Sequence, residues 1–287
     1  MDQPIHEIAS PIIAVRNGSE EIVSGTAVIV GPGLALTAYH VIADFVERYE
    51  GDRDIGLHLN VSFELLLFLG LDQGKTILPL KVLRIWNSDP LDIAILALAV
   101  PEELPEGHIW KAPTLSLLPP KMGEDVCAFG FADSQVARNE PSAINTINLH
   151  PRTALGTVRM VHHDQRDRFR LPFPCFQTDA RFDGGMSGGP VFNSTGSLCG
   201  IICSTLPPSD PTEEHISYAC TLWPMMGIAV DIGINSYATG LYRPMYSLLE
   251  EGKIMARDSA FVSVAPGENG TWQPSATYNA TNWMKAA

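Results

Sequence analysis

Residues 184–189 have the sequence Gly-Gly-Met-Ser-Gly-Gly and constrain the fold more than any other stretch of this chain. Glycine inside a helix or strand costs roughly 0.5–1 kcal/mol relative to alanine, so this stretch predicts neither element. It predicts a tight loop, because glycine accepts positive φ and lets other groups approach the backbone closely. A loop of this kind presents the Ser187 hydroxyl and nearby N–H groups outward, as an acyl-transfer site requires.

Length and charge limit the classes of protein to consider. A chain of 287 residues with 45% hydrophobic residues can form one large domain or two small ones. Its net charge of −13 disfavours binding to nucleic acid or an anionic membrane surface. The apolar runs near 63–71 and 93–100 are far shorter than the roughly 18 residues of a membrane span. We therefore expect neither nucleic acid nor a membrane as partner.

The five cysteines are odd in number and show neither a CxxC pair nor a zinc-like spacing to histidine. They are Cys127, Cys175, Cys199, Cys203 and Cys220. We expect reduced, mostly buried thiols, no metal and no other cofactor. The N-terminus lacks the basic and apolar segments of a signal peptide, which predicts a cytoplasmic protein if Met1 is the native start.

Many short apolar runs bounded by Gly, Pro, Asp or Asn predict an all-β chain built as a sandwich or as barrels. Asn17-Gly18 predicts a hairpin between strands at 12–15 and 22–30. Further strands are expected near 34–40, 57–71, 77–86, 93–99, 126–131, 152–162, 175–179, 190–192, 198–205 and 216–222. One short helix is expected just after His40, and a long loop at 140–150.

A serine nucleophile needs a base within hydrogen-bond reach and a third group that orients the base. Among eight histidines, His40 stands out because it ends an apolar strand beside a predicted helical turn. Asp92 enters an apolar run, where a carboxylate is costly unless it is hydrogen-bonded, and a histidine Nδ1–H is a suitable partner. Either residue taken alone also fits a purely structural role.

Three motifs considered together identify a family resemblance. Thr-Ala-Tyr-His at 37–40, Asp-Ile-Ala-Ile-Leu at 92–96 and Gly-Gly-Met-Ser-Gly-Gly-Pro at 184–190 resemble the catalytic motifs of trypsin-like (chymotrypsin-fold) serine peptidases. The resemblance covers roughly residues 10–225. It is closest to bacterial HtrA-type and related intracellular peptidases, because Thr-Asp-Ala at 178–180 precedes the serine loop as in them.

The resemblance implies two antiparallel six-stranded β-barrels, at 1–118 and 119–233, that act on a protein or peptide substrate. A C-terminal extension at 234–287 follows, with a helix within 244–257 and a weakly ordered tail from Ser263, and it does not resemble a PDZ domain. By carry-over, Ser187 is the nucleophile and His40 the general base and then acid. Asp92 orients the imidazole, and the N–H groups of Gly185 and Ser187 form the oxyanion hole.

The chain departs from the family pattern at two positions. Met186 stands where secreted digestive relatives carry an aspartate that pairs with a newly cut N-terminus, so zymogen activation of that kind is not expected. Cys203, or Ser204 if the register shifts by one, stands where many relatives have a serine that supports the triad aspartate.

Family alignment also implies a set of residues around the substrate's P1 side chain. They are Arg181, Phe182, Cys203, Ser204 and Thr205. An inward Phe182 predicts a small or medium apolar P1 residue, whereas an inward Arg181 predicts an acidic one. We favour the first, because a buried unpaired arginine is costly.

Two other functions fit parts of the sequence. Residues 185–189 match the GxSxG pattern of α/β-hydrolase esterases. That fold needs an acid and a histidine after the serine, for which this chain offers only Asp210 and His215 in one short loop. It also needs alternating strands and helices, which the sequence does not show. A catalytically latent trypsin-like domain that serves in binding or signalling is the second. A protease that is always active inside a cell would be hazardous, so we expect its activity to be regulated. The candidates are an activating protein partner, the loops at 140–150 and 207–214, and the tail from Ser263.

Overall fold

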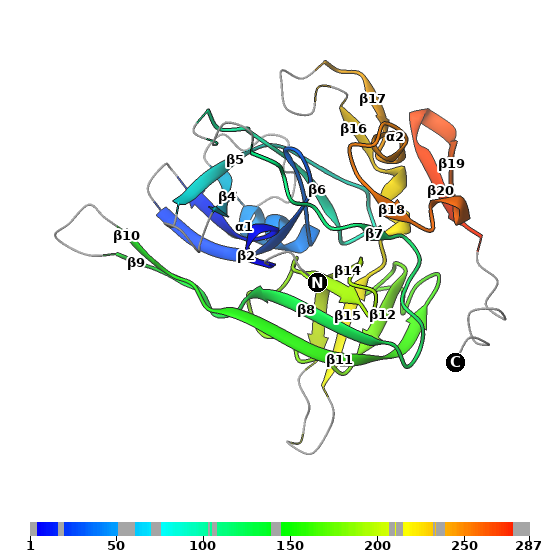
Figure 1. Cartoon of the computed structure of the whole chain (residues 1–287), viewed down its shortest axis with the longest axis horizontal. Helices are drawn as coiled ribbons and strands as arrows, with labels where there is room; N and C mark the ends of the chain where they lie inside the picture. Colours follow the sequence, from blue (N-terminus) through cyan, green and yellow to red (C-terminus); the bar gives the residue numbers. More distant parts are fainter. Residues whose placement is uncertain are drawn as a thin grey trace.

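The structure is a computed structural model, which describes residues 5–16, 20–50, 61–69, 76–102, 104, 108–138, 145–206, 210, 215–231, 233 and 239–277. Two β-barrels stand side by side, and the C-terminal strands lie together at one end of the molecule (Figure 1). No helix among the described residues is long and apolar enough to span a membrane.

The first barrel closes in the strand order β1-β2-β3-β6-β5-β4. Its strands are β1 (Ala9–Arg16), β2 (Glu20–Gly31), β3 (Leu34–Thr37), β4 (Val61–Leu69), β5 (Thr76–Asn87) and β6 (Ala94–Leu98), preceded by the 3-10 turn η1 (Ile5–Glu7). All five residues of β6 are apolar and buried, so the barrel interior fills with aliphatic side chains. Gly33 has a φ of +66°, which lets the chain turn tightly from β2 into β3.

The second barrel forms from β13-β8-β11-β12-β15-β14, and β13 pairs with β14 to close it. Its strands are β8 (Asp125–Phe131), β11 (Pro151–His162), β12 (Cys175–Thr178), β13 (Pro190–Asn193), β14 (Leu198–Leu206) and β15 (Ile216–Cys220). The predicted all-β fold of two antiparallel six-stranded barrels is confirmed.

Two expected features differ from the structure. The strand expected over 34–40 ends at Thr37, and α1 (Tyr39–Glu50) begins before His40 rather than after it. The expected loop at 140–150 contains β10 (Asn145–Asn148), which pairs with β9 (Gln135–Arg138). The hairpin turn predicted at Asn17-Gly18, residues 139–144 and most of 207–214 lie outside the described residues.

The C-terminal extension is more ordered and less helical than expected. The elements after β15 are η3 (Trp223–Gly227), β16 (Ala229–Asp231), β17 (Tyr242–Pro244), α2 (Tyr246–Glu250), β18 (Ala256–Arg257), η4 (Ser259–Phe261), β19 (Val262–Pro266), η5 (Glu268–Gly270) and β20 (Trp272–Ala276). The expected helix over 244–257 shortens to α2. The expected weakly ordered tail is wrong for 263–276, because β19 pairs with β20.

The extension is joined to both barrels. β18 pairs in parallel with β7 (Leu115–Ser116), a strand of the connection between the barrels, and β7 pairs in parallel with β14 of the second barrel. On the first barrel, Arg84 of β5 lies 3.4 Å from the carboxylate of Asp231, which precedes the extension and accepts hydrogen bonds from the N–H groups of Thr239 and Gly240 within it. The extension therefore braces the barrels instead of trailing from them.

Candidate active site

His40 and Asp92 meet because the strands beside them are neighbours in the first barrel. β3 pairs with β6 with Thr37 opposite Ala94, so residues after β3 lie next to residues before β6. Nδ1 of His40 is 2.8 Å from Oδ2 of Asp92, and the main-chain N–H of His40 donates to Oδ1 over 2.9 Å. Asp92 therefore holds both the imidazole and the backbone that carries it.

This contact sets the state of the ring. An ionised carboxylate only accepts hydrogen bonds, so Nδ1 of His40 is the donor, and in the neutral form of the ring the lone pair is then on Nε2. The His40 side chain is 32% exposed, whereas that of Asp92 is 15% exposed. The imidazole of His40 is therefore more accessible to solvent than the carboxylate that holds it.

Ser187 lies in the loop between β12 and β13, on the side of the second barrel that meets the first. Gly188, which follows it, has a φ of +83°, and a Cβ there would lie 2.1 Å from Oγ1 of Thr37 and 2.2 Å from the carbonyl oxygen of Thr26. Only glycine fits such a conformation and such a contact. The loop therefore packs directly against the end of β3, just before His40.

Hydrogen bonds fix the direction of successive peptide groups in this loop. The N–H of Asp133 donates to the carbonyl of Gly184 over 2.8 Å, and Oγ1 of Thr26 donates to the carbonyl of Gly185 over 3.0 Å. The N–H of Gly189 donates to the carbonyl of Met186 over 2.9 Å. In a trans peptide the N–H points opposite to the carbonyl. The N–H groups of Gly185 and Ser187 therefore point away from these partners, and within the described residues neither donates to a protein acceptor. Two such groups beside a serine can bind an anionic oxygen.

Met186 completes the loop on its inner side. Its side chain is fully buried in the core of the second barrel, its N–H donates to the carbonyl of Asp183 (3.1 Å), and its sulfur accepts from the N–H of Asp183 (3.4 Å). The position where digestive relatives place an aspartate is thus an apolar packing position in this chain. The loop is ordered by packing without an ion pair there.

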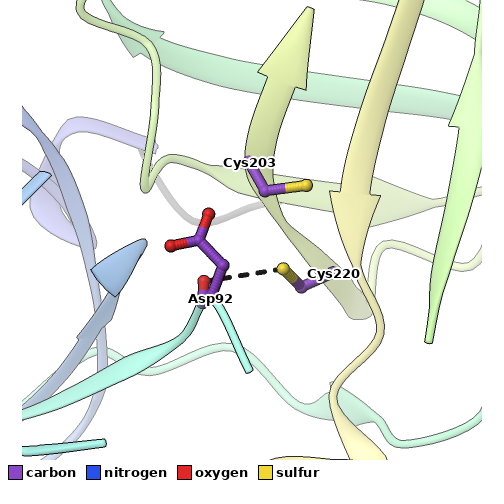
Figure 2. A group of neighbouring side chains, drawn as sticks. All are labelled: Asp92, Cys203 and Cys220. Atoms are coloured by element: carbon purple, nitrogen blue, oxygen red, sulfur yellow. Dashed lines mark hydrogen bonds between the residues drawn. The ribbon is translucent and has the colours of Figure 1, made fainter. Parts of the chain in front are cut away.

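Two thiols lie behind Asp92, on neighbouring strands of the second barrel (Figure 2). Cys220 donates to the main-chain carbonyl of Asp92 over 3.5 Å, and Cys203 donates to the carbonyl of Tyr218 over 3.3 Å. The Cys203 thiol therefore does not take the place of the serine hydroxyl that supports the triad aspartate in many relatives. His40 supplies hydrogen bonds to both carboxylate oxygens instead.

Asp92, Cys203 and Cys220 offer ligand atoms within 4.8 Å of one another, which are types that a thiophilic metal ion accepts. Thiols must lose their protons to bind such an ion. Burial raises the pKa of Cys220 well above its ordinary value, and the Asp92 carboxylate is already bound by His40. All five cysteines are free thiols.

The residues expected around the P1 side chain separate into inward and outward groups. Phe182 is 4% exposed and packs in the core cluster of the second barrel, and Cys203 is also buried. Arg181 is exposed, and its Nε lies 2.7 Å from Oδ1 of Asp183. Ser204 is half-buried and Thr205 exposed.

Sequence reasoning missed Thr26 and Asp133, which hold the serine loop from outside. Neither belongs to a recognisable motif. The only signal at Thr26 is a hydroxyl in a strand whose next residues, 27–30, are all apolar. Asp133 has a φ of +48°, a conformation that aspartate tolerates better than most residues, but the sequence does not show it.

The two barrels exclude the α/β-hydrolase fold that the GxSxG pattern alone would allow. A family model of the trypsin-like peptidase domain matches residues 25–201. No curated protein matches the sequence.

Three solved structures illustrate what the chain is similar to. The crystal structure of Deg5 is 18% identical, with 75% of this chain and 84% of that chain covered and a TM-score of 0.50. The active form of the Rv3671c protease from M. tuberculosis is 16% identical, with 76% and 77% covered and a TM-score of 0.47. The HtrA-type protease AlgW with a decapeptide is 19% identical, with 75% and 61% covered and a TM-score of 0.48. At 18% identity, the likeness to Deg5 concerns the fold alone.

Proposed function

Because the chain belongs to the family of trypsin-like peptidases and is a serine endopeptidase, we propose that His40, Asp92 and Ser187 are its catalytic triad. The observation that carries this proposal is the His40–Asp92 contact of 2.8 Å in the first barrel. It faces a glycine loop whose serine has two outward N–H groups beside it. Each part has the chemistry that acyl transfer needs.

In the proposed reaction, Nε2 of His40 takes the proton of the Ser187 hydroxyl as its oxygen attacks the peptide carbonyl. The carbonyl oxygen becomes an oxyanion and accepts hydrogen bonds from the N–H groups of Gly185 and Ser187, each worth about 3 kcal/mol in the transition state. The C–N bond then breaks, and His40 gives its proton to the leaving amine. An acyl-enzyme ester on Ser187 remains.

Water completes the cycle by the same groups in reverse. His40 takes a proton from water, whose oxygen attacks the ester carbonyl, and then returns that proton to the Ser187 oxygen as the ester bond breaks. The carboxylic acid product leaves and the free serine is restored. Throughout, Asp92 keeps Nδ1 protonated and stabilises the imidazolium when it forms.

The substrate preference follows from the inward and outward residues. A buried Phe182 occupies space beside the serine loop, and the exposed Arg181 is neutralised by Asp183. These positions support a small or medium apolar P1 residue over an acidic one. Cys203, Ser204 and Thr205 would form the opposite wall.

We place the enzyme in the cytoplasm, as a selective peptidase under regulation. Five free thiols, three of them with pKa values raised strongly by burial, suit a reducing compartment. With Met186 buried, activation does not use an aspartate paired to a new N-terminus. An activating protein partner and the segments 140–150 and 207–214 stay as proposals for control.

The tail from Ser263 is a third candidate for control. Because β19 and β20 form part of the fold, deleting 263–287 tests stability and regulation together. Deleting 278–287 alone tests regulation more directly, and unchanged turnover would remove those ten residues from consideration.

The triad is tested by labelling the purified protein with a fluorophosphonate beside Ser187→Ala and His40→Ala. Rapid labelling of the wild type alone, with cleavage of a peptide library, is the expected result. A folded wild type that neither labels nor cleaves would contradict the proposal and favour a latent domain that acts in binding or signalling.

A further inference from the structure

Thr26 of β2 uses each of its polar atoms in a hydrogen bond, and its hydroxyl and main-chain N–H bond to residues of the second barrel. Its hydroxyl donates to the carbonyl of Gly185 over 3.0 Å and accepts from the N–H of Phe131 over 3.0 Å. Its main-chain N–H donates to the carbonyl of Ser187 over 2.9 Å. Its own carbonyl accepts from Oγ1 of Thr37 over 2.7 Å.

The position of Thr26 in its strand makes this possible. The residue opposite it in β1 is Pro11, which has no N–H to donate. The side chain of Thr26 is fully buried, so water does not compete for these hydrogen bonds. The hydroxyl and the N–H of this first-barrel residue therefore bond to the second barrel, while its carbonyl bonds to Thr37 of the first barrel.

These contacts act on the peptide groups that frame the proposed oxyanion hole. The two carbonyls that Thr26 binds belong to Gly185 and Ser187, whose own N–H groups would stabilise the oxyanion. Rotation of the Gly185–Met186 peptide would break the hydroxyl contact, and rotation of the Ser187–Gly188 peptide would break the main-chain contact. The peptide group that carries the Ser187 N–H lies between these two, so Thr26 holds the peptide on each side of that donor and also the peptide that follows the Gly185 N–H.

We propose that Thr26 is a positioning residue whose hydroxyl holds the N–H groups of the oxyanion hole in place before the substrate binds. This inference rests on the proposed triad mechanism. It predicts that loss of the hydroxyl weakens binding of the tetrahedral transition state more than binding of the substrate. Such a loss lowers kcat and leaves KM nearly unchanged.

The test compares Thr26→Val, which keeps the shape and removes the hydroxyl, with Thr26→Ser, which restores it. Thr221→Val is the matched control. Thr221 is also buried, and its hydroxyl donates one hydrogen bond, to the carbonyl of Pro174, which the variant loses. Each variant is measured for kcat and KM on one peptide substrate, for inhibition by a peptide boronic acid, and for its thermal midpoint. The final extent of fluorophosphonate labelling gives the concentration of active enzyme.

For Thr26→Val we expect kcat per active site to fall about tenfold to a hundredfold, less than for loss of an oxyanion donor itself. The inhibition constant of the boronic acid, whose adduct places an oxygen in the hole, should rise by a similar factor. Thr26→Ser should stay within about threefold of wild type, and Thr221→Val should lower the thermal midpoint without changing kcat.

If Thr26→Val does not fold, Thr26→Cys takes its place, since a thiol donates only weakly and should give an intermediate kcat. The inference is overturned if Thr26→Val, or Thr26→Cys in its place, keeps the wild-type kcat, or if KM changes instead. A boronic acid constant that does not move would also overturn it. A wild type without labelling or turnover would refute the triad and this inference together, whereas an active wild type with an unchanged Thr26→Val refutes this inference alone.

Discussion

In the first barrel the site consists of two side chains, and in the second it consists mainly of backbone. His40 and Asp92 are joined by a contact of 2.8 Å between their side chains, and the fold only has to bring β3 and β6 together. Around Ser187 the proposed oxyanion donors are N–H groups, whose directions depend on positive φ angles and on hydrogen bonds from other segments. Substitutions at His40 or Asp92 should therefore lower activity by changing the chemistry of a side chain. Substitutions around Ser187 should lower it by changing the geometry of the backbone.

Asp92→Asn should separate chemistry from geometry most clearly. The amide matches the carboxylate in shape but permits the wrong tautomer of His40, so kcat should fall about 10⁴-fold with little change in the thermal midpoint. Steady-state kinetics and thermal unfolding of the same sample measure both. A loss below about tenfold would mean that Asp92 does not serve His40 in catalysis.

Gly188→Ala should damage the site around Ser187 by geometry alone. A Cβ at this position meets backbone and side-chain atoms of the first barrel in a left-handed conformation, so the free energy of unfolding should fall by about 2–5 kcal/mol and labelling should be lost.

The matched control is Gly252→Ala. Gly252 has a φ of +69° with nothing within 4 Å of its Cβ position, so it should cost only about 1–2 kcal/mol of backbone strain. Denaturant unfolding compares the two variants. Equal losses would show that the contact between the barrels at Gly188 contributes nothing.

Phe182→Ala should change the preference for the P1 residue while His40, Asp92 and Ser187 stay in place. A larger space beside the serine loop should raise kcat/KM for a bulky apolar P1 residue relative to a small one by about 10–200-fold. Arg181→Ala is the neighbouring control and should leave the preference unchanged, because that side chain faces solvent. A peptide library with varied P1 residues measures both, and an altered preference in Arg181→Ala instead would reverse the assignment of the two positions.

Asp231 should have the smallest effect, confined to stability in acid. Burial raises its pKa, but hydrogen bonds from the N–H groups of Gly233, Thr239 and Gly240 and from the Thr239 hydroxyl outweigh burial and lower the pKa to about 2. Because the folded pKa lies below the ordinary 3.8, this stabilisation is complete above pH 3.8 and is lost as the pH falls toward 2.

Asp231→Asn should therefore lower the thermal midpoint at neutral pH, and the difference from wild type should vanish near pH 2. Thermal unfolding across this range measures it. The kcat per active site should not change, since Asp231 joins the extension to the first barrel away from the triad. A constant difference at all pH values would mean that the carboxylate charge is not the cause.

In the proposed site, the sequence indicates the side chains more directly than the backbone groups. Short sequence motifs indicate the proposed roles of His40, Asp92 and Ser187. No such motif marks Thr26 or Asp133, because their role depends on carbonyls far away in the chain, 159 residues away for Thr26 and Gly185. A hydroxyl in a strand looks the same in sequence whether it binds such a carbonyl or its own barrel.

The fold shows the same division. The strands and the two barrels follow from apolar runs and turns, which are local signals. The pairing of β19 with β20 does not, because residues 263–276 are rich in polar and small types and gain order by packing on η3, where Pro274 lies against Gly227. Composition predicted weak order there because it records no tertiary contact.

The close approach of Gly188 to Thr26 and Thr37 has a consequence for how such a sequence can change over generations. A larger residue at 188 has no room unless positions in the other barrel withdraw, and a substitution at 26 or 37 removes partners on which the loop depends. Thr26 and Thr37 lie in one barrel, and Gly188 lies in the other and far along the chain, so substitutions at these positions should occur together. Recombination that exchanged one barrel for that of a distant relative would have to carry a matching partner with it.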